Sequence, residues 1–116
     1  MDQLNRPILV VEDDAANRFM LSLTLKQAGY RVETAATAAH ALELLKRERF
    51  ATMITDGRME PIDGRELSKQ AKRIQPDLRI GMVSAVYNDT DIDDAPIDAI
   101  FAKPVPTESL IGWLRR

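Results

Sequence analysis

The chain has 116 residues, of which 45% are hydrophobic and 29% are charged, proportions that suit one globular domain with its own core. The net charge of −2 provides no basic footprint for nucleic acid, and the lack of cysteine excludes disulfides and thiolate metal sites. The opening residues lack the apolar core of a signal peptide, and no apolar run is long enough to span a membrane. We therefore expect a single cytoplasmic domain over residues 1–116 that contacts neither nucleic acid nor membrane.

The first predicted element is a strand that ends abruptly in acids. Residues 7–11 form a continuous apolar and β-branched run, as in a strand that is covered on both faces. Glu12, Asp13 and Asp14 follow directly, and we assign Asp14 to the cap of the next helix.

A helix is predicted over residues 15–28, and Gly29 supplies its left-handed stop. One side of this helix would carry Phe19, Met20 and Leu23. Leu21 and Leu25 lie nearby.

A second strand and a second helix follow. Residues 30–35 alternate weakly, as in a strand, and Thr37 is placed to cap a helix that runs to about residue 48. The apolar stripe of that helix is Ala38, Ala41, Leu42 and Leu45.

The third strand ends on a single acid. Residues 51–55 suit a buried strand, and Asp56 then lies where the strand emerges at its carboxyl end. Turn residues lead through Pro61 to Gly64, and a helix is expected over residues 65–74.

The last third of the chain predicts two more strands. Residues 79–83 form a buried strand that ends at Ser84, and residues 99–102 form a fifth strand that ends at Lys103. Between them the acidic stretch 87–96 supports at most a weak or irregular fourth helix. A final helix starts at Pro106 and Thr107 and points Leu110, Ile111 and Leu114 inward, and we interpret Trp113 as half-buried packing.

Strand and helix thus alternate five times, which predicts an α/β fold. Right-handed crossovers place helices on both faces of a five-stranded parallel sheet, as a doubly wound three-layer sandwich.

Polar residues follow four of the predicted strands: Glu12 and Asp13, Asp56, Ser84, and Lys103. Parallel strands end at one edge of the sheet, so these side chains should meet there. Two like charges about 4 Å apart cost roughly 1 kcal/mol in water and about 4 kcal/mol at an intermediate dielectric. Because all ligands in this cluster are oxygens, the counter-ion that fits is Mg²⁺ or Mn²⁺.

The same edge holds the parts needed for phosphoryl transfer to a carboxylate. A metal ion, the Lys103 ammonium, the Ser84 hydroxyl and the backbone N–H groups of Gly57 and Ala85 would surround a phosphoryl group on Asp56.

Over essentially its whole length the chain resembles the receiver domain of two-component response regulators. The resemblance is carried by the run Ile-Leu-Val-Val-Glu-Asp at residues 8–13, Asp56 with Met59 and the Asp63–Gly64 pair, Ser84–Ala85 and Lys103–Pro104. It implies the flavodoxin-like (βα)5 architecture with strand order 2-1-3-4-5.

The resemblance also implies roles for the acids. Asp56 would accept a phosphoryl group from the phosphohistidine of a sensor kinase. Asp13 and Asp56 would bind Mg²⁺ directly, Glu12 would act mainly through water, and the backbone carbonyl of Arg58 would be a further ligand.

By the same resemblance, Lys103 would pair with the phosphate, and its bond to Pro104 is expected to be cis. Ser84 would move toward the phosphate and carry the signal outward. The protein would be a signalling phosphoacceptor that catalyses only its own phosphorylation and dephosphorylation, and not an enzyme with a small substrate.

Three features depart from the family pattern. Family members place Met-Pro three and four residues after the acceptor, whereas here Met59 is followed by Glu60 and Pro61. Ile100 occupies the usual position of an aromatic switch, so an aromatic-flip output is not expected. The segment 88–95 is short and predicted to be mobile or irregular.

Other functions remain open at this point. The sequence argues against two of them, because a flavodoxin would need a phosphate loop where the acids 12–14 stand, and a haloacid-dehalogenase-type phosphatase would need an acid where Arg58 stands. The remaining alternatives are a phosphorylation-independent receiver-like binding module and the receiver piece of a hybrid kinase or larger regulator.

The expected partners are a sensor histidine kinase or phosphotransfer protein and a downstream protein target. A homodimer could form through the face of the fourth helix, fifth strand and fifth helix.

Overall fold

In the computed structural model, which describes residues 6–85 and 96–116, the chain is built on a five-stranded parallel sheet of order β2-β1-β3-β4-β5. This confirms the predicted doubly wound α/β fold and its strand order. The strands are β1 (Ile8–Val11), β2 (Val32–Ala35), β3 (Thr52–Asp56), β4 (Arg79–Ser84) and β5 (Ala99–Ala102).

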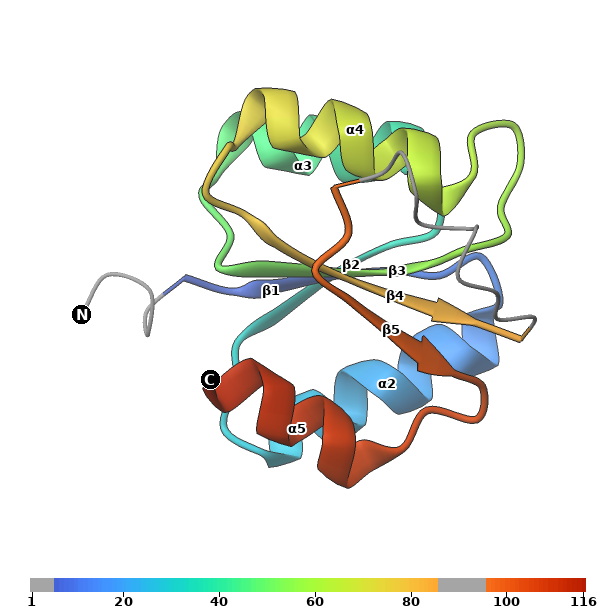
Figure 1. Cartoon of the computed structure of the whole chain (residues 1–116), viewed down its shortest axis with the longest axis vertical. Coiled ribbons are helices and arrows are strands. Elements are labelled where there is room, and N and C mark those ends of the chain that lie inside the picture. The colour runs from blue at the N-terminus through green and yellow to red at the C-terminus, as the bar shows by residue number, and fades with distance from the viewer. Residues whose placement is uncertain (1–5, 86–95) are drawn as a thin grey trace.

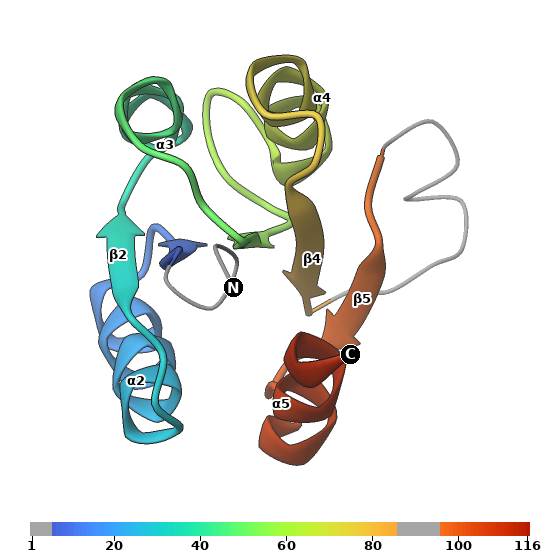
Figure 2. The ribbon, with the colours of Figure 1, turned by 90° about the vertical axis from the view of Figure 1, so that its left-hand side faces the viewer.

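Helices cover both faces of the sheet, so the molecule has three layers (Figures 1 and 2). One face carries α3 and α4, and the other carries α2 and α5. Their bounds are α2 (Ala15–Gln27), α3 (Ala38–Arg47), α4 (Gly64–Ile74) and α5 (Thr107–Arg115). The predicted weak helix within residues 87–96 falls almost wholly outside the described residues. No helix in the part of the chain that the structure describes is long and apolar enough to cross a membrane.

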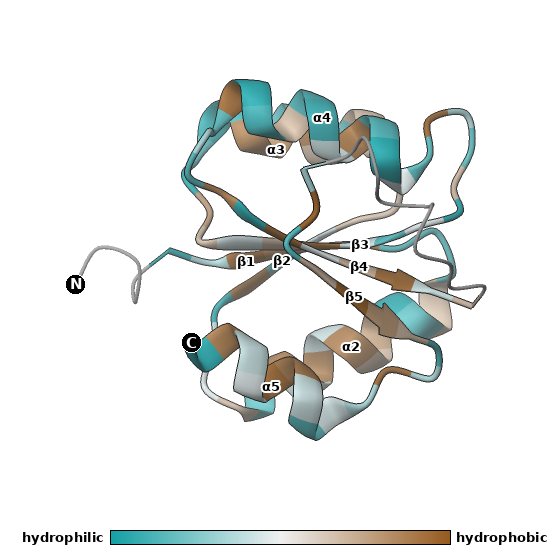
Figure 3. Cartoon of the chain, in the orientation of Figure 1, coloured by the Kyte–Doolittle hydropathy of each residue, from teal (hydrophilic) through white to brown (hydrophobic). Residues whose placement is uncertain are grey.

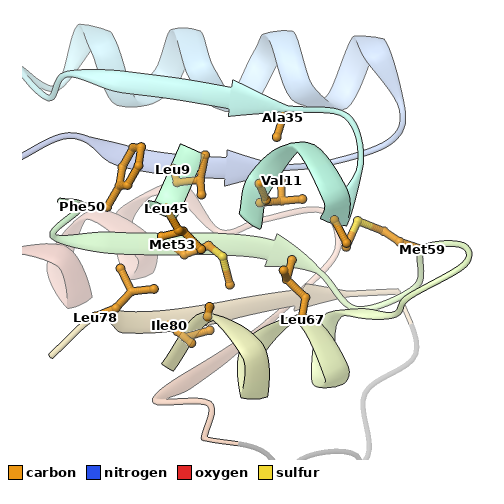
Figure 4. Close-up of a cluster of buried hydrophobic side chains, with 13 residues drawn as sticks. Leu9, Val11, Ala35, Leu45, Phe50, Met53, Met59, Leu67, Leu78 and Ile80 are labelled. Carbon is orange, nitrogen blue, oxygen red and sulfur yellow. The ribbon is translucent and has the colours of Figure 1, made fainter. Parts of the chain in front are cut away.

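The strands are rich in apolar residues because both faces of the sheet are covered (Figure 3). On β1, Leu9 and Val11 face α3 and α4, whereas Ile8 and Val10 belong to the core on the side of α2 and α5. This division follows from the two-residue period of a strand. Figure 4 shows the first of these cores, in which Met53 of β3 lies between side chains of β1 and β4.

Local signals set the helix starts. The side chains of Asp14, Thr37 and Asp63 each accept the backbone N–H of the residue three positions later, which satisfies an otherwise unpaired donor at the helix N-terminus. Gly29 has φ +100°, as predicted for the residue that ends α2. Asp14 is therefore the cap, which leaves Glu12 and Asp13 for the sheet edge.

Trp113 of α5 is buried, in agreement with its interpretation as a packing residue. Its ring meets Phe101 edge-on at 5.7 Å between centroids, and the Arg79 guanidinium lies 4.3 Å from its centroid. A Cβ atom on Gly81 would lie 3.0 Å from this ring, so the glycine makes room for it. Phe101 therefore packs into the core beside α5, and Ile100 lies half-buried beside it in β5.

Candidate functional site

Asp56 is the last residue of β3 and lies at the carboxyl edge of the sheet. Its side chain is buried, and its Oδ1 accepts the backbone N–H of Arg58 at 3.3 Å. The backbone behind it is held closely, because a Cβ atom on Gly64 would collide with the Asp56 carbonyl oxygen. Gly64 also donates its N–H to the Gly57 carbonyl at 3.1 Å. These contacts fix the position from which the carboxylate projects.

Three carboxylates meet at this edge. One ligand oxygen each from Glu12, Asp13 and Asp56 lies within 4.8 Å of the others. Glu12 and Asp56 are buried and Asp13 is exposed, so the cluster is open to solvent on the side of Asp13. The prediction that the ends of β1 and β3 bring these acids together is confirmed.

Lys103 bridges two of the acids. Its Nζ lies 3.2 Å from Glu12 Oε1 and 3.3 Å from Asp56 Oδ2. Its backbone N–H donates to the Ser84 carbonyl at 3.1 Å, which joins the start of the loop after β5 to the end of β4. The Lys103–Pro104 peptide bond is cis, as expected. When all four groups are ionised, three carboxylates face one ammonium, which leaves an excess of two negative charges.

The pKa values of two groups reflect this crowding. Burial raises the pKa of Glu12, and the charge of Asp56 raises it further, although a hydrogen bond from Asp14 and the Lys103 ammonium oppose both effects. Burial lowers the pKa of Lys103, but the combined attraction of Asp56 and Glu12 outweighs it and leaves that pKa above the ordinary value of 10.5. The ammonium therefore stays charged at neutral pH.

Ser84 is buried at the end of β4 and lies beside the residue that follows Asp56. A Cβ atom on Gly57 would be 3.5 Å from the Ser84 Cβ. Ala85 comes next and is exposed. Ser84 and Ala85 therefore reach the same edge as the acids, as predicted.

The structure differs from the prediction at Gly57. Its N–H donates to the Val83 carbonyl at 2.9 Å, because hydrogen bonding between β3 and β4 continues one residue past Asp56. The N–H that points at the Asp56 carboxylate belongs instead to Arg58. The sequence suggested Arg58 only through its carbonyl.

Two further contacts around Glu12 have no clear signal in the sequence. The Arg18 guanidinium donates to the Glu12 carbonyl at 2.9 Å, and the Asp14 N–H donates to the Glu12 carboxylate at 3.1 Å. The first turns of α2 thus hold the acidic loop in place. Helical spacing alone does not show that the Arg18 side chain folds back from α2 onto the loop that precedes the helix.

The loop after Asp56 is anchored by Met59, whose side chain is buried in the core beside α3 and α4 (Figure 4). Glu60 and Pro61 are exposed, and the bond between them is cis. The added Glu60 charge therefore lies in the solvent.

A cavity of about 610 Å³ opens beside the site, between α2 and the start of α5. Asp56, Glu12 and Lys103 lie at its polar end. Its apolar walls include Met20 and Leu21 of α2, Ile54 of β3, and Val105 and Leu110 from the last part of the chain.

The family model for the response regulator receiver domain matches residues 8–115. The chain belongs to this family. It is 37% identical over 113 residues to the response regulator receiver protein CpdR of Brucella abortus, a match that covers 94% of this chain and 93% of CpdR. Other curated relatives are longer, and the chain spans as little as 24% of their length.

Solved structures agree. A CheY-like receiver domain protein from Methanospirillum hungatei superimposes with a TM-score of 0.88 at 29% identity, covering 95% of this chain and 90% of that one. The response regulator TrrA of Thermotoga maritima, solved in complex with Mg²⁺ and BeF, gives a TM-score of 0.85 at 25% identity, with 95% and 96% covered. The chain is therefore a receiver domain of two-component signalling, a class that works with a kinase or phosphotransfer partner and a downstream effector.

Proposed function

We propose that Asp56 accepts a phosphoryl group from the phosphohistidine of a sensor histidine kinase or phosphotransfer protein. The observation that carries this proposal is the bridged pair at the sheet edge, where Lys103 lies within 3.3 Å of both Asp56 and Glu12. A buried carboxylate with an ammonium beside it and a cavity in front of it is suited to receive a trianionic group.

The same cluster fits a divalent metal ion. Glu12, Asp13 and Asp56 supply only oxygen ligands, which Mg²⁺ and Mn²⁺ prefer, and their oxygens already lie within 4.8 Å of one another. Asp13 and Asp56 would hold the ion directly, Glu12 mainly through water, and the Arg58 carbonyl would complete the protein ligands. When bound, the ion supplies positive charge against the phosphoryl oxygens.

The protein groups have separate tasks in the transfer. A carboxylate oxygen of Asp56 forms the new bond to phosphorus, and the bond from phosphorus to the histidine nitrogen breaks with its electron pair staying on nitrogen. Lys103 turns from the carboxylates toward the arriving oxygens. The Ser84 hydroxyl and the N–H groups of Arg58 and Ala85 donate to these oxygens. Arg58 replaces Gly57 in this role because the Gly57 N–H is already bonded to the Val83 carbonyl.

The output is a changed protein–protein contact. Ser84 joins the site to β4 and, through its carbonyl, to the loop after β5, so its movement would alter the adjacent surface. In this proposal the protein is a cytoplasmic switch that catalyses only its own phosphorylation and dephosphorylation. A homodimer through the face of β5, α5 and the weak fourth helix expected between β4 and β5 stays a prediction, because that helix falls almost wholly outside the described residues.

The direct test is labelling by a small phosphodonor. Wild-type protein incubated with acetyl phosphate and Mg²⁺ should gain the mass of one phosphoryl group. Asp56→Asn should remove the label. The matched control is Asp77→Asn, which changes an exposed aspartate that is bound to Arg6 and Arg49 rather than to the acidic cluster and should label normally.

Two results would contradict the proposal. Label that persists in Asp56→Asn would place the acceptor elsewhere. A wild-type protein that binds Mg²⁺ but never takes label, from acetyl phosphate or from a phosphorylated kinase, would favour a phosphorylation-independent binding module.

A further inference from the structure

The outer side of α2 is apolar. Phe19, Met20 and Leu23 are the large hydrophobic residues that are exposed among those the structure describes, with 65%, 58% and 38% of their surface accessible. The inner side of the same helix is apolar as well, since Leu25 is fully buried against the sheet. Figure 3 shows the contrast with α4, whose outer side is hydrophilic. A helix that is apolar on both sides is normally covered on both.

The pattern along this outer side fits another helix. Ala16, Met20, Leu23 and Gln27 are all exposed and are spaced by four, three and four residues, which is the spacing of a helix-packing seam. None of these four side chains is charged. Phe19 flanks the seam and extends the apolar surface next to Met20 and Leu23.

We propose that the occupant is a second copy of this chain, packed α2 against α2 in antiparallel orientation about a twofold axis. This arrangement pairs Met20 of each copy with Leu23 of the other. The helix is complementary to itself in charge, because exposed Asp13 and Asp14 stand at its N-terminus and exposed Lys26 lies in its last turn. The antiparallel arrangement brings the basic end of each helix to the acidic end of its mate, and the two helix dipoles also oppose each other.

The seam spans only three helical turns, so the contact is smaller than the roughly 800 Å² per partner of a standard stable interface. A weak dimer that depends on protein concentration is therefore expected. Met20 also lines the cavity that opens at Asp56, together with Asn17 of the same helix. The dimer would cover this side of the cavity and compete with any phosphodonor that approaches over α2. That competition rests on the proposed function, whereas the dimer itself does not.

Sedimentation equilibrium of the metal-free protein tests the dimer from about 10 μM to about 1 mM, which covers weak dissociation constants. We expect the wild type to move from monomer toward dimer over this range. Leu23→Glu should weaken association by about a hundredfold or more, because it would bury an unpaired carboxylate next to apolar side chains. Ala39→Glu, at an exposed position of α3, is the matched control and should associate like the wild type.

Cross-linking reports the orientation, since the chain contains no cysteine of its own. An oxidised mixture of Met20→Cys and Leu23→Cys proteins should form the mixed disulfide dimer faster than a mixture of either with Ala39→Cys. A wild type that stays monomeric to about 1 mM would overturn the proposal, and so would a dimer that persists in Leu23→Glu. Acetyl phosphate labelling of monomeric Leu23→Glu tests the proposed function separately.

Discussion

Lys103 is the residue on which the charge balance of the site depends. It is the ammonium that meets both Glu12 and Asp56, and only a quarter of its side chain is exposed. Burial is the main cause of the raised pKa of Glu12, whereas the negative charge of Asp56 and Glu12 raises the pKa of Lys103. Removing the ammonium therefore leaves repulsion between the acids without compensation.

Lys103→Ala should lower the free energy of unfolding of the metal-free protein by about 1–3 kcal/mol, between the values for exposed and buried ion pairs. It should retain Mg²⁺ binding, because the three acids are unchanged, but lose the conformational response to phosphorylation. Chemical denaturation, Mg²⁺ titration and the Trp113 fluorescence change on labelling measure these effects.

The control is Lys72→Ala, which removes a lysine of similar exposure that pairs with Asp98 at 3.5 Å, away from the acidic cluster. It should leave the phosphorylation response intact. An unaltered response in Lys103→Ala would remove the role assigned to this lysine.

Asp77 lies just before the start of β4, at the other end of the strands from the acidic cluster. It shows how the stability contributed by an exposed acid depends on pH. A hydrogen bond from Arg6, together with the charge of Arg49, holds its pKa below the ordinary value of 3.8. A lowered pKa means that the stabilisation is fully present above pH 3.8 and is lost as the pH falls through the folded-state pKa. Asp77→Asn should therefore be less stable than the wild type at neutral pH and approach it in acid.

Urea unfolding of both proteins between about pH 2 and pH 7 measures this difference. A gap in stability that is constant over the whole range would mean that the ion pairs with Arg6 and Arg49 are not its source.

At the scale of elements, the end of β3 and the start of α4 act as one unit. Gly64 begins α4 and packs directly against the Asp56 carbonyl and against Gly57, whose Cα would lie 3.1 Å from an added Cβ. The side chain of Asp63 caps the same helix through the Glu66 N–H. The start of α4 is therefore held directly against the end of the acceptor strand.

Gly64→Ala should lower the free energy of unfolding by about 1–3 kcal/mol, as expected for overpacking against backbone that cannot move aside freely. It should also slow labelling by acetyl phosphate, because the strain moves the end of β3. Thermal unfolding and labelling time courses measure the two effects.

Gly112→Ala serves as the comparison, since an added Cβ there meets nothing within 4 Å and the residue lies in α5. That variant should gain up to about 1 kcal/mol from helix propensity and label normally. Equal behaviour of the two alanine variants would show that the packing of Gly64 against Asp56 is unimportant.

At the scale of the whole molecule, the fold concentrates negative charge at one edge of the sheet. The chain carries 18 acidic and 16 basic residues, so the excess at the site is as large as the net charge of the entire protein. A bound divalent ion would relieve this repulsion in the native state only. Metal binding should therefore raise the free energy of unfolding.

Saturating Mg²⁺, at about 100 times its dissociation constant, should raise the free energy of unfolding by about 2.7 kcal/mol and the melting temperature by roughly 10 °C. Calorimetry with and without Mg²⁺ measures the shift, and an equal ionic strength of NaCl controls for screening.

Asp13→Asn removes the exposed carboxylate of the cluster and should abolish most of the Mg²⁺ effect. A shift of the same size in that variant would place the ion elsewhere.

Much of the molecule follows from its sequence. The five strands, their buried character and the residues that end them are readable, because parallel strands terminate at one edge and local caps such as Asp14 and Thr37 mark where helices begin. This was sufficient to predict that Glu12, Asp56 and Lys103 meet. The phosphoacceptor and metal-binding roles stay predictions.

The tertiary structure alone decided other points. It assigned the Gly57 N–H to Val83 and aimed the Arg58 N–H at Asp56, since the length of a sheet ladder depends on the neighbouring strand. It also decided that Phe19 and its neighbours face outward. Helical spacing identifies residues that share a side, but when both sides of a helix are apolar only packing against the sheet determines which of them is buried.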